Sequence, residues 1–479
     1  MASTSGSSSS GSSHADRVPD DPAPAGHVHD DDVHDDDVHD DGVHDDHVLA
    51  RVPKSARFHW FSVATQRFGQ LSTLASFLIG ATLGFGMTFW NAVLAITLGA
   101  VILEIMTIFT GIAGQREGLS TSLLARWTGF GAAGASLIGL AISISAVGWF
   151  GIQNAVSADG LVELVGFLPS WGWALVVGLI ITAVVVYGVG SMAWAAYITV
   201  PAFLVMAGWS IAVELSRHDL GALTSAEPAG PPLSLLQGTT IVAGGFIVGA
   251  VITPDMSRFN RSAKDVVKQT VVGITVGEYV IGLIGVLLAL ALRTSDVIAI
   301  VTSTSGFLGT LIIVAATVKV NDWNLYAASL GVVTFADQTF GRRLHRGAVT
   351  VVVGVLGSVL GAAGVLDSFT DFLDLLGVLF PPIAGIMVAE YFAVRTWRSR
   401  LDETRATGEL PATSPLWVPA SLVVWAVAAF VGKYVHWGLP SINSVVVAFV
   451  LYVAAARLGL VRGVGTAPTR RAAPGATTA

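Results

Sequence analysis

The sequence predicts an all-α membrane protein with about twelve transmembrane helices, on the evidence of its composition, its apolar runs and the placement of its basic residues. The chain has 479 residues, of which 53% are hydrophobic and 12% charged, with a mean hydropathy of +0.69. Soluble domains carry about 25% charged residues, so a soluble enzyme and a nucleic-acid binder are excluded and the lipid bilayer is the expected surrounding. The chain has no cysteine, which excludes disulfides, thiolate metal sites and cysteine nucleophiles.

Apolar runs bounded by charges, Gly or Pro predict the individual spans, each of which needs about 20 apolar residues to cross a bilayer. They lie near residues 66–88, 91–113, 131–157, 172–191, 195–215, 237–253, 267–292, 306–332, 347–366, 371–393, 416–432 and 441–459.

The Lys and Arg residues test this set of spans. If the N-terminus is cytoplasmic, 22 of them fall on the inner side, including Arg67 at the start of the first span. Only Arg217, Arg293 and Lys433 fall outside, and Lys319 lies within a span. Because Lys and Arg concentrate in cytoplasmic loops, this distribution predicts a multi-pass protein of the cell membrane with both termini in the cytoplasm.

The two ends of the chain differ from the transmembrane domain predicted at 56–460. Residues 1–50 hold 13 Asp and one Arg, with a repeated Val-His-Asp-Asp-Asp unit and no apolar run. Residues 1–55 are therefore expected to form a disordered, His/Asp-rich cytoplasmic tail, and residues 461–479 a second disordered tail. Weak binding of divalent metal by the His-Asp repeat is the alternative interpretation of the first tail. No cofactor or metal site is predicted within the transmembrane domain.

Two of the predicted spans contain helix-breaking residues. The first carries the segment 69–73, and the sixth carries Gly244, Gly245 and Gly249 followed by Thr253-Pro254-Asp255. Discontinuous helices at matching positions of two halves are typical of transporters built on inverted repeats, and they are tolerated where they line a cavity. The pattern thus predicts a five-plus-five inverted repeat with discontinuous helices 1 and 6. Glycines that only allow close helix packing would produce the same pattern.

Several motifs, in their order and spacing, carry a resemblance to a known family. They are Gly118-Leu119-Ser120-Thr121-Ser122-Leu123-Leu124-Ala125-Arg126, Val147-Gly148-Trp149-Phe150-Gly151-Ile152-Gln153, Asp255-Met256-Ser257-Arg258-Phe259-Asn260-Arg261, Asn321-Asp322-Trp323-Asn324-Leu325-Tyr326-Ala327, Pro381-Pro382-Ile383-Ala384-Gly385 and Ala389-Glu390-Tyr391. Over about residues 55–460 the chain resembles the nucleobase:cation symporter family, in its cytosine/purine permease branch. The resemblance implies the leucine-transporter-type five-plus-five fold, with a substrate site between spans one, three, six and eight.

Trp149 and Gln153 are the first candidates for binding a flat, polar ring. They are four residues apart and so share one helix face, where the indole can stack on a ring and the amide can bond its edge. The resemblance implies these same two roles. Packing or interfacial anchoring of Trp149, and an interhelical hydrogen bond of Gln153, are the alternatives.

The interrupted spans supply further candidates. The resemblance implies that Phe246 closes the other ring face, and backbone groups exposed at Gly245 would bond a ligand edge. Gln70 and Thr73, in the first span, are weaker substrate-binding candidates. A Phe in a span otherwise faces lipid or core.

The eighth span supplies the ion-coupling candidates. Asn321 is a candidate substrate-binding residue. Sodium-coupled relatives place hydroxyl side chains just before this Asn, where the chain has Lys319 and Val320. An ammonium group would repel sodium, so Lys319, with Asp322 and the backbone of Gly69, is expected to serve proton coupling. The alternative is a static ion pair of Lys319 with Asp322, or with one of the mid-span carboxylates of Glu104 and Glu278.

The predicted function is a symporter, and not an enzyme, that imports a small nucleobase-like heterocycle such as cytosine or a purine, coupled to protons. Cytosine permeases carry polar residues where this chain has Ala146, Gly245 and Ala316, which argues against a cytosine-tuned site. The alternatives are a sodium-coupled or a vitamin- or hydantoin-type transporter, a channel, or a receptor that binds without transport. The sequence makes no prediction of the oligomeric state.

Overall fold

The structure is a computed structural model that describes residues 50–187, 192–342, 344–435 and 437–469. Most of both predicted tails therefore lies outside the described residues. The described helices belong to one unit of the chain, His47–Ala479. Their bounds are α1 Trp60–Leu71, α2 Leu74–Gly86, α3 Phe89–Glu117, α4 Thr121–Trp127, α5 Gly131–Val165, α6 Ser170–Tyr187, α7 Met192–Arg217, α8 Leu220–Thr224, α9 Leu235–Val251, α10 Pro254–Ser257, α11 Ala263–Leu292, α12 Val297–Phe340, α13 Arg346–Ala362, α14 Phe369–Leu379, α15 Pro381–Val388, α16 Arg398–Arg405, α17 Pro419–Tyr434 and α18 Pro440–Arg457. Short helical turns η1 (Lys54–Ala56), η3 (Val365–Ser368) and η4 (Ala389–Val394, a π-helix) complete the set.

Each of the twelve predicted ranges overlaps one or more of these helices. Among the described residues, six helical segments are long and apolar enough to cross a membrane, or seven if the bent pair α1–α2 counts as one span. Four shorter apolar helices, α6, α9, α13 and α17, accompany them. The chain is thus a helical protein with several apolar spans.

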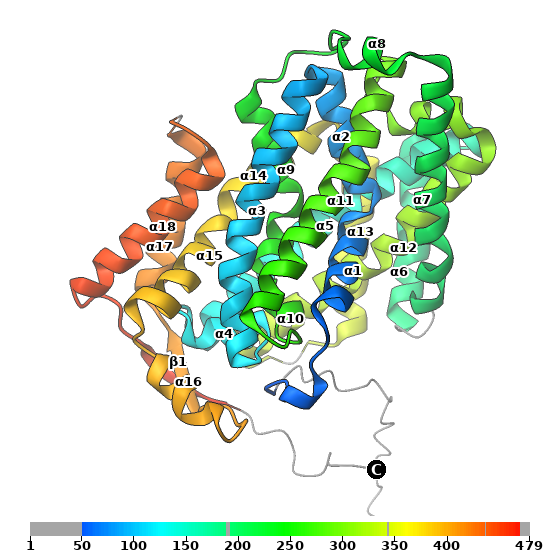
Figure 1. The fold of residues 1–479 in the computed structure, drawn as a ribbon. Helices are drawn as coiled ribbons and strands as arrows, with labels where there is room; N and C mark the ends of the chain where they lie inside the picture. Colours follow the sequence, from blue (N-terminus) through cyan, green and yellow to red (C-terminus); the bar gives the residue numbers. More distant parts are fainter. Residues whose placement is uncertain (1–49, 188–191, 343, 436, 470–479) are drawn as a thin grey trace, which may run out of the picture. The chain divides into compact units, whose positions relative to one another are not determined.

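The two ends of the helical bundle are distinct (Figure 1). The short helices α4, α10 and α16 lie at one end, called here the α4 end, and α8 lies at the other, called here the α8 end. A two-stranded antiparallel sheet of β1 (Thr413–Trp417) and β2 (Val464–Pro468) joins the α4 end. This hairpin departs from the all-α expectation, and β2 falls within the segment expected to be a disordered tail.

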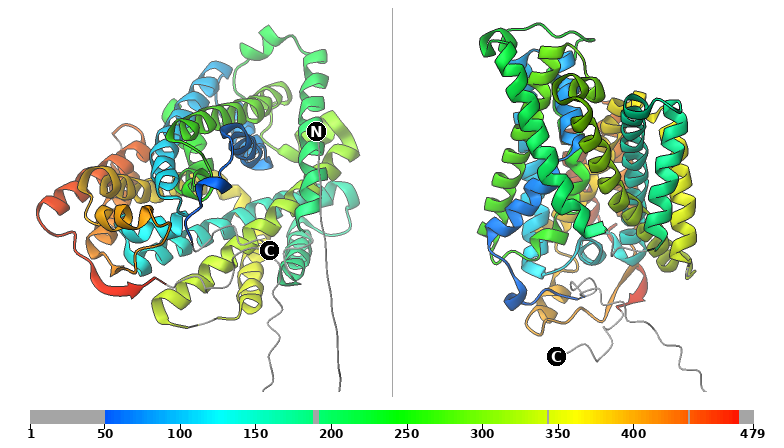
Figure 2. Two further views of the ribbon diagram at one scale, coloured as in Figure 1. Left: turned by 60° about the horizontal axis from the view of Figure 1, so that its bottom comes forward. Right: turned by 90° about the vertical axis from the view of Figure 1, so that its right-hand side faces the viewer.

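Glycines let several helices approach closely. A β-carbon on Gly80 or Gly84 of α2 would overlap the backbone of α11. In the same way, α6 packs on α13 and α12 packs on α5 through glycines, and α12 also packs on α7 (Figure 2). Close approach through small residues is the usual packing mode where lipid removes the hydrophobic drive for association. The glycine-rich stripes of the spans therefore pack helix against helix.

The first span is broken where the sequence predicts it. Helices α1 and α2 meet at Ser72 and Thr73 with a bend of 58°. The eighth span also has a break that the sequence did not predict, because Gly306 interrupts α12 with a φ of +59°. Glycine takes this left-handed conformation without steric cost. At the first of these breaks the buried Ser72 hydroxyl has no hydrogen-bond partner among the described residues.

Candidate functional site

Trp149 and Gln153 lie one turn apart on α5, as the sequence predicts. The ring of Trp149 meets Phe372 edge-on at 5.4 Å and Phe369 at 6.1 Å between centroids. Gln153 is 3% exposed, and its side-chain carbonyl oxygen has no hydrogen-bond partner among the described residues. A buried amide oxygen without a partner costs about 1–3 kcal/mol. The pair therefore presents an aromatic ring beside an unused acceptor.

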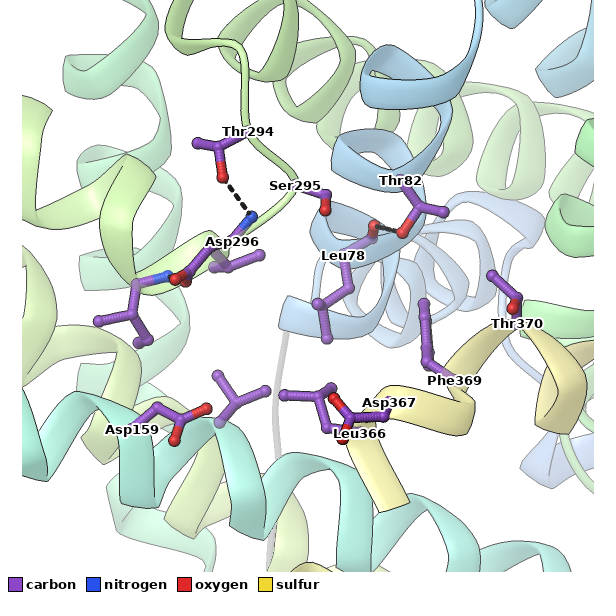
Figure 3. A pocket seen from close by; sticks show the side chains of 13 residues that line it. Leu78, Thr82, Asp159, Thr294, Ser295, Asp296, Leu366, Asp367, Phe369 and Thr370 are labelled. Atoms are coloured by element: carbon purple, nitrogen blue, oxygen red, sulfur yellow. Dashed lines mark hydrogen bonds between the residues drawn. The ribbon is translucent and has the colours of Figure 1, made fainter. Parts of the chain in front are cut away.

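A cavity of about 400 Å³ opens toward the α8 end, along the same stripe of α5 (Figure 3). Val156 and Asp159 line it, three and six residues beyond Gln153. Phe369 lines it as well, and its ring contacts that of Trp149. The volume falls in the range of about 300–1,000 Å³ that is typical of small-molecule sites. The cavity thus reaches the aromatic group around Trp149.

Three carboxylates surround this cavity, those of Asp159, Asp296 and Asp367 (Figure 3). Asp296 caps the N-terminus of α12, where its carboxylate accepts the backbone N–H groups of Ile298 at 2.9 Å and Ala299 at 3.1 Å. Asp159 accepts the hydroxyl of Ser170. Nowhere in the described part of the chain do three His, Asp or Glu side chains gather closely enough to hold a metal ion.

The sixth span differs from its prediction. Helix α9 runs without interruption through Gly244, Gly245 and Gly249, and it ends only at Val251. A β-carbon at Gly244 would overlap the carbonyl of Leu373, and one at Gly245 would overlap the side chain of Ile79. These glycines are therefore explained by close packing on α14 and α2, and the predicted exposure of backbone at Gly245 is wrong for this conformation. The break follows at Ile252 and Thr253, before α10.

Phe246 lies on this continuous helix beside a residue that the sequence analysis missed. The guanidinium carbon of Arg67 lies 5.6 Å from the centroid of the Phe246 ring. Arg67 was assigned to the cytoplasmic side, yet it is fully buried inside the bundle. The first span begins at Trp60 and not near 66, so Arg67 lies in the middle of α1. A charged residue followed by a helix-breaking segment was the signal that could have identified it.

The other first-span candidates divide into two groups. Gln70 is exposed and Gly69 lies inside the regular helix α1, so neither reaches the buried site in this conformation. Thr73 occupies the N-cap position of α2 and is partly buried. Its neighbour Ser72 is buried, and the Ser72 hydroxyl has no partner among the described residues. The break thus contributes an unpaired hydroxyl that the sequence analysis did not select.

The eighth-span candidates are paired with protein groups. Asn321 is fully buried, donates to the backbone carbonyl of Phe150 at 3.0 Å and accepts from Asn324 at 3.1 Å. Its amide therefore ties α12 to α5. The Lys319 ammonium donates to both carboxylate oxygens of Asp322, at 3.1 and 3.2 Å, while Glu104 accepts from Thr275. Of the ion pairs weighed for Lys319, the structure contains the one with Asp322.

The chain is similar in sequence to a family of permeases and to several known proteins. The family model described as "Permease for cytosine/purines, uracil, thiamine, allantoin" matches residues 51–457. The cytosine permease of Escherichia coli (strain K12) is 30% identical over 398 residues, which cover 82% of this chain and 90% of that protein. The hydantoin permease of Microbacterium maritypicum is 28% identical over 425 residues, covering 83% and 85%.

Solved structures share the fold. The inward-facing conformation of Mhp1 matches with a TM-score of 0.74 at 21% identity, covering 86% of this chain and 93% of that chain. Mhp1, a nucleobase-cation-symport-1 family transporter, also matches in a closed conformation with bromovinylhydantoin bound, with a TM-score of 0.69 at 22% identity, covering 86% and 95%.

Proposed function

This chain belongs to the family of permeases for cytosine and purines, uracil, thiamine and allantoin, and we propose that it imports a nucleobase-like heterocycle into the cell. It is a multi-pass membrane protein and a secondary transporter, not an enzyme. The transported ligand of this family is a small heterocyclic molecule.

The single observation that supports a ring site on α5 is the unpaired carbonyl oxygen of Gln153 beside the Trp149 ring. A nucleobase combines a flat π-face with N–H donors on its edge. The ring would stack on Trp149, and an edge N–H would donate to Gln153, which removes the cost of the unpaired acceptor. Phe369 and Phe372 hold the indole from the side, and the cavity of Figure 3 gives the ring a path toward Trp149.

The substrate we propose is a ring other than cytosine. Ala146 and Ala316 offer no polar group, and Gly245 is filled by the neighbouring side chain of Ile79. Fewer polar partners favour a purine or a hydantoin-like ring over cytosine. The similarity to a hydantoin permease supports a hydantoin-like ring as a candidate substrate beside a purine.

We also propose that transport does not require sodium and is coupled to protons. The Lys319 ammonium pairs with Asp322 at the place where a sodium-coupled site would need neutral oxygen ligands. A cation already resident there would repel Na⁺. Protonation of this pair would then replace sodium binding in the transport cycle.

Uptake by the purified protein in liposomes tests the function. Labelled cytosine, uracil, hypoxanthine and allantoin are each supplied with sodium, without sodium, and with a protonophore. Saturable uptake of one ring that ignores sodium and stops with the protonophore is expected. Sodium-stimulated uptake would overturn the coupling proposal, and uptake of none of the rings would overturn the substrate proposal.

Twelve crossings with both termini in the cytoplasm form the topology that we propose, supported by the Lys and Arg distribution. The absence of native cysteine allows a direct test. A single cysteine at Ser295, which lines the cavity at the α8 end, should react in intact cells with a membrane-impermeant maleimide. A cysteine at Thr407, beyond α16 at the α4 end, should react only after lysis. The reverse pattern would overturn the orientation.

A further inference from the structure

Arg67 is a buried cation beside Phe246, the residue expected to close the second face of the bound ring. Its side chain is fully buried, and a β-carbon on Gly273 of α11 would overlap the Arg67 stem. Gly273 therefore leaves the space that the arginine fills. The Arg67 guanidinium lies over Phe246 and contacts Thr253, at the break that follows α9. It thus sits close to the discontinuities of both the first and the sixth span.

The hydrogen bonds of this guanidinium are long and incomplete. One terminal nitrogen donates to the Gly249 carbonyl at 3.4 Å and the other to the Thr253 hydroxyl at 3.3 Å. Typical N–H···O distances are about 2.7–3.2 Å. The Nε–H group is buried and has no partner among the described residues. Of the five N–H donors of an arginine, most are therefore free to bind an additional acceptor.

No carboxylate compensates the charge of Arg67 within the described part of the chain, where none lies within 4.0 Å of the guanidinium. The nearest negative potential comes from the C-terminal carbonyls of α9, and a helix end amounts to only about half a unit charge. Buried Arg51, by contrast, has the carboxylate of Glu117 at 2.9 Å. Arg67 is thus a buried cation without a full counter-charge.

An uncompensated charge inside a membrane protein is costly and marks a functional position. A guanidinium binds a carboxylate or a delocalised oxyanion through paired N–H groups. We propose that Arg67 binds the negative charge of the transported substrate, so that this permease prefers heterocycles that are anionic at neutral pH. This inference rests on the proposed transport of a nucleobase-like ring. The anion is either a carboxylate attached to the ring or an ionised ring N–H.

Two pairs of rings, each of one neutral and one anionic member, test this preference. Reconstituted protein is supplied at pH 7 with labelled uracil or with orotate, which is uracil bearing a ring carboxylate. It is also supplied with hypoxanthine or with urate, whose ring N–H is ionised. At least one anion should be taken up with a KM about tenfold or more below that of its neutral counterpart, since hydrogen bonds to charged groups are the stronger ones. The two pairs separate a ring carboxylate from an ionised ring.

Variants of Arg67 separate substrate binding from a structural role. Arg67→Met should raise the KM for the preferred anion about tenfold or more and leave the KM for the neutral ring within twofold, whereas Arg67→Lys should recover part of the anion preference. Gln66→Leu, at an exposed position of the same helix, is the control. If Arg67 only caps α9, Arg67→Met would lower uptake of charged and neutral rings equally, and this would overturn the inference.

If Arg67→Met does not fold, uptake by the wild-type protein alone still tests the preference for anionic rings. Uptake of neutral rings with no preference for either anion overturns the anion site and leaves the proposed function standing. Failure to take up any of the four rings overturns both.

Discussion

Two buried charges in this protein, Glu117 and Arg67, have opposite surroundings. Glu117 ends α3, and its side chain is fully buried at the α4 end of the bundle. Arg51, Arg405 and the Tyr391 hydroxyl all donate to its carboxylate. Arg67 has two long hydrogen bonds and a bare Nε–H. One charge is saturated by protein groups and the other is not.

We interpret the difference as one between polar groups that hold the fold and polar groups that are available to a ligand. The Glu117 carboxylate binds residues up to 288 positions away along the chain, and both of its oxygens accept hydrogen bonds. Gln153 at the proposed site, Ser72 at the break of the first span and Arg67 in the helix before that break each keep an unpaired polar atom. A buried unpaired group costs free energy, so a ligand that pairs with these three groups would remove part of that cost. We therefore expect substitutions in the Glu117 cluster to change thermal stability, and substitutions at the proposed site to change transport.

The largest expected effect follows from removing the saturated carboxylate. Glu117→Leu leaves the buried Arg51 without its counter-charge, and breaking such a pair costs about 3–5 kcal/mol. We expect a large fall in the thermal unfolding temperature of the purified protein in detergent. The control is Asp402→Asn, because Asp402 is exposed and its pairing with Arg405 contributes little. Equal shifts for the two variants would contradict the distinction.

A change at the proposed site should act on transport and spare stability. Gln153→Leu removes an amide that has an unpaired oxygen in the free protein, so thermal stability should stay the same or rise slightly. The KM for the transported ring should rise about tenfold, the effect of losing a hydrogen bond of about 1.5 kcal/mol. Gln66→Leu, the same substitution at an exposed position, should change neither quantity. A destabilised Gln153→Leu protein with unchanged KM would show that Gln153 belongs with the structural groups.

The sequence predicted those parts of the molecule that depend on local runs of residues. Each apolar run became helix. The first break appeared at Ser72 and Thr73, where the largely polar segment 69–73 interrupts the apolar run. The predicted unwinding at Gly244 and Gly245 was wrong because both glycines serve contacts with α14 and α2. Whether a glycine breaks a helix or packs it depends on the neighbouring helix, which the local sequence does not contain.

The residues missed by the sequence analysis are those defined by distant partners. Glu117 meets Arg405 only after the chain has folded, and Arg67 meets Phe246 across 178 intervening positions. The strand pair β1–β2 likewise joins Thr413 to Pro468. Lys319, in contrast, finds its partner Asp322 three residues away, so that pairing could be weighed from sequence. Sequence separation thus accounts for what was predicted and what was not.

The smallest expected effect concerns Asp255, which lies beyond the end of α9 at the α4 end. Its carboxylate accepts the backbone N–H of Thr121 at 2.7 Å, at the start of α4. Burial raises the pKa of Asp255, and this is only partly offset by the Thr121 hydrogen bonds and the charge of Arg258.

A carboxyl whose pKa is raised in the folded state binds more protons there than in the unfolded state, so its contribution to stability falls as the pH rises through the folded pKa. Asp255→Asn keeps an oxygen for the Thr121 N–H and removes the charge. The variant should match the wild type near about pH 2.5, more than one unit below the ordinary Asp pKa of about 3.9, where the carboxyl is protonated in both states. Toward pH 7 it should become the more stable protein, because the charged carboxylate of the wild type is the form that burial disfavours. Thermal unfolding of both proteins across this range measures the difference. If the variant instead loses stability relative to the wild type as the pH rises, the charge of Asp255 itself stabilises the fold, as that of Glu117 does. The charges that are fully paired by protein groups would then include Asp255 in α10.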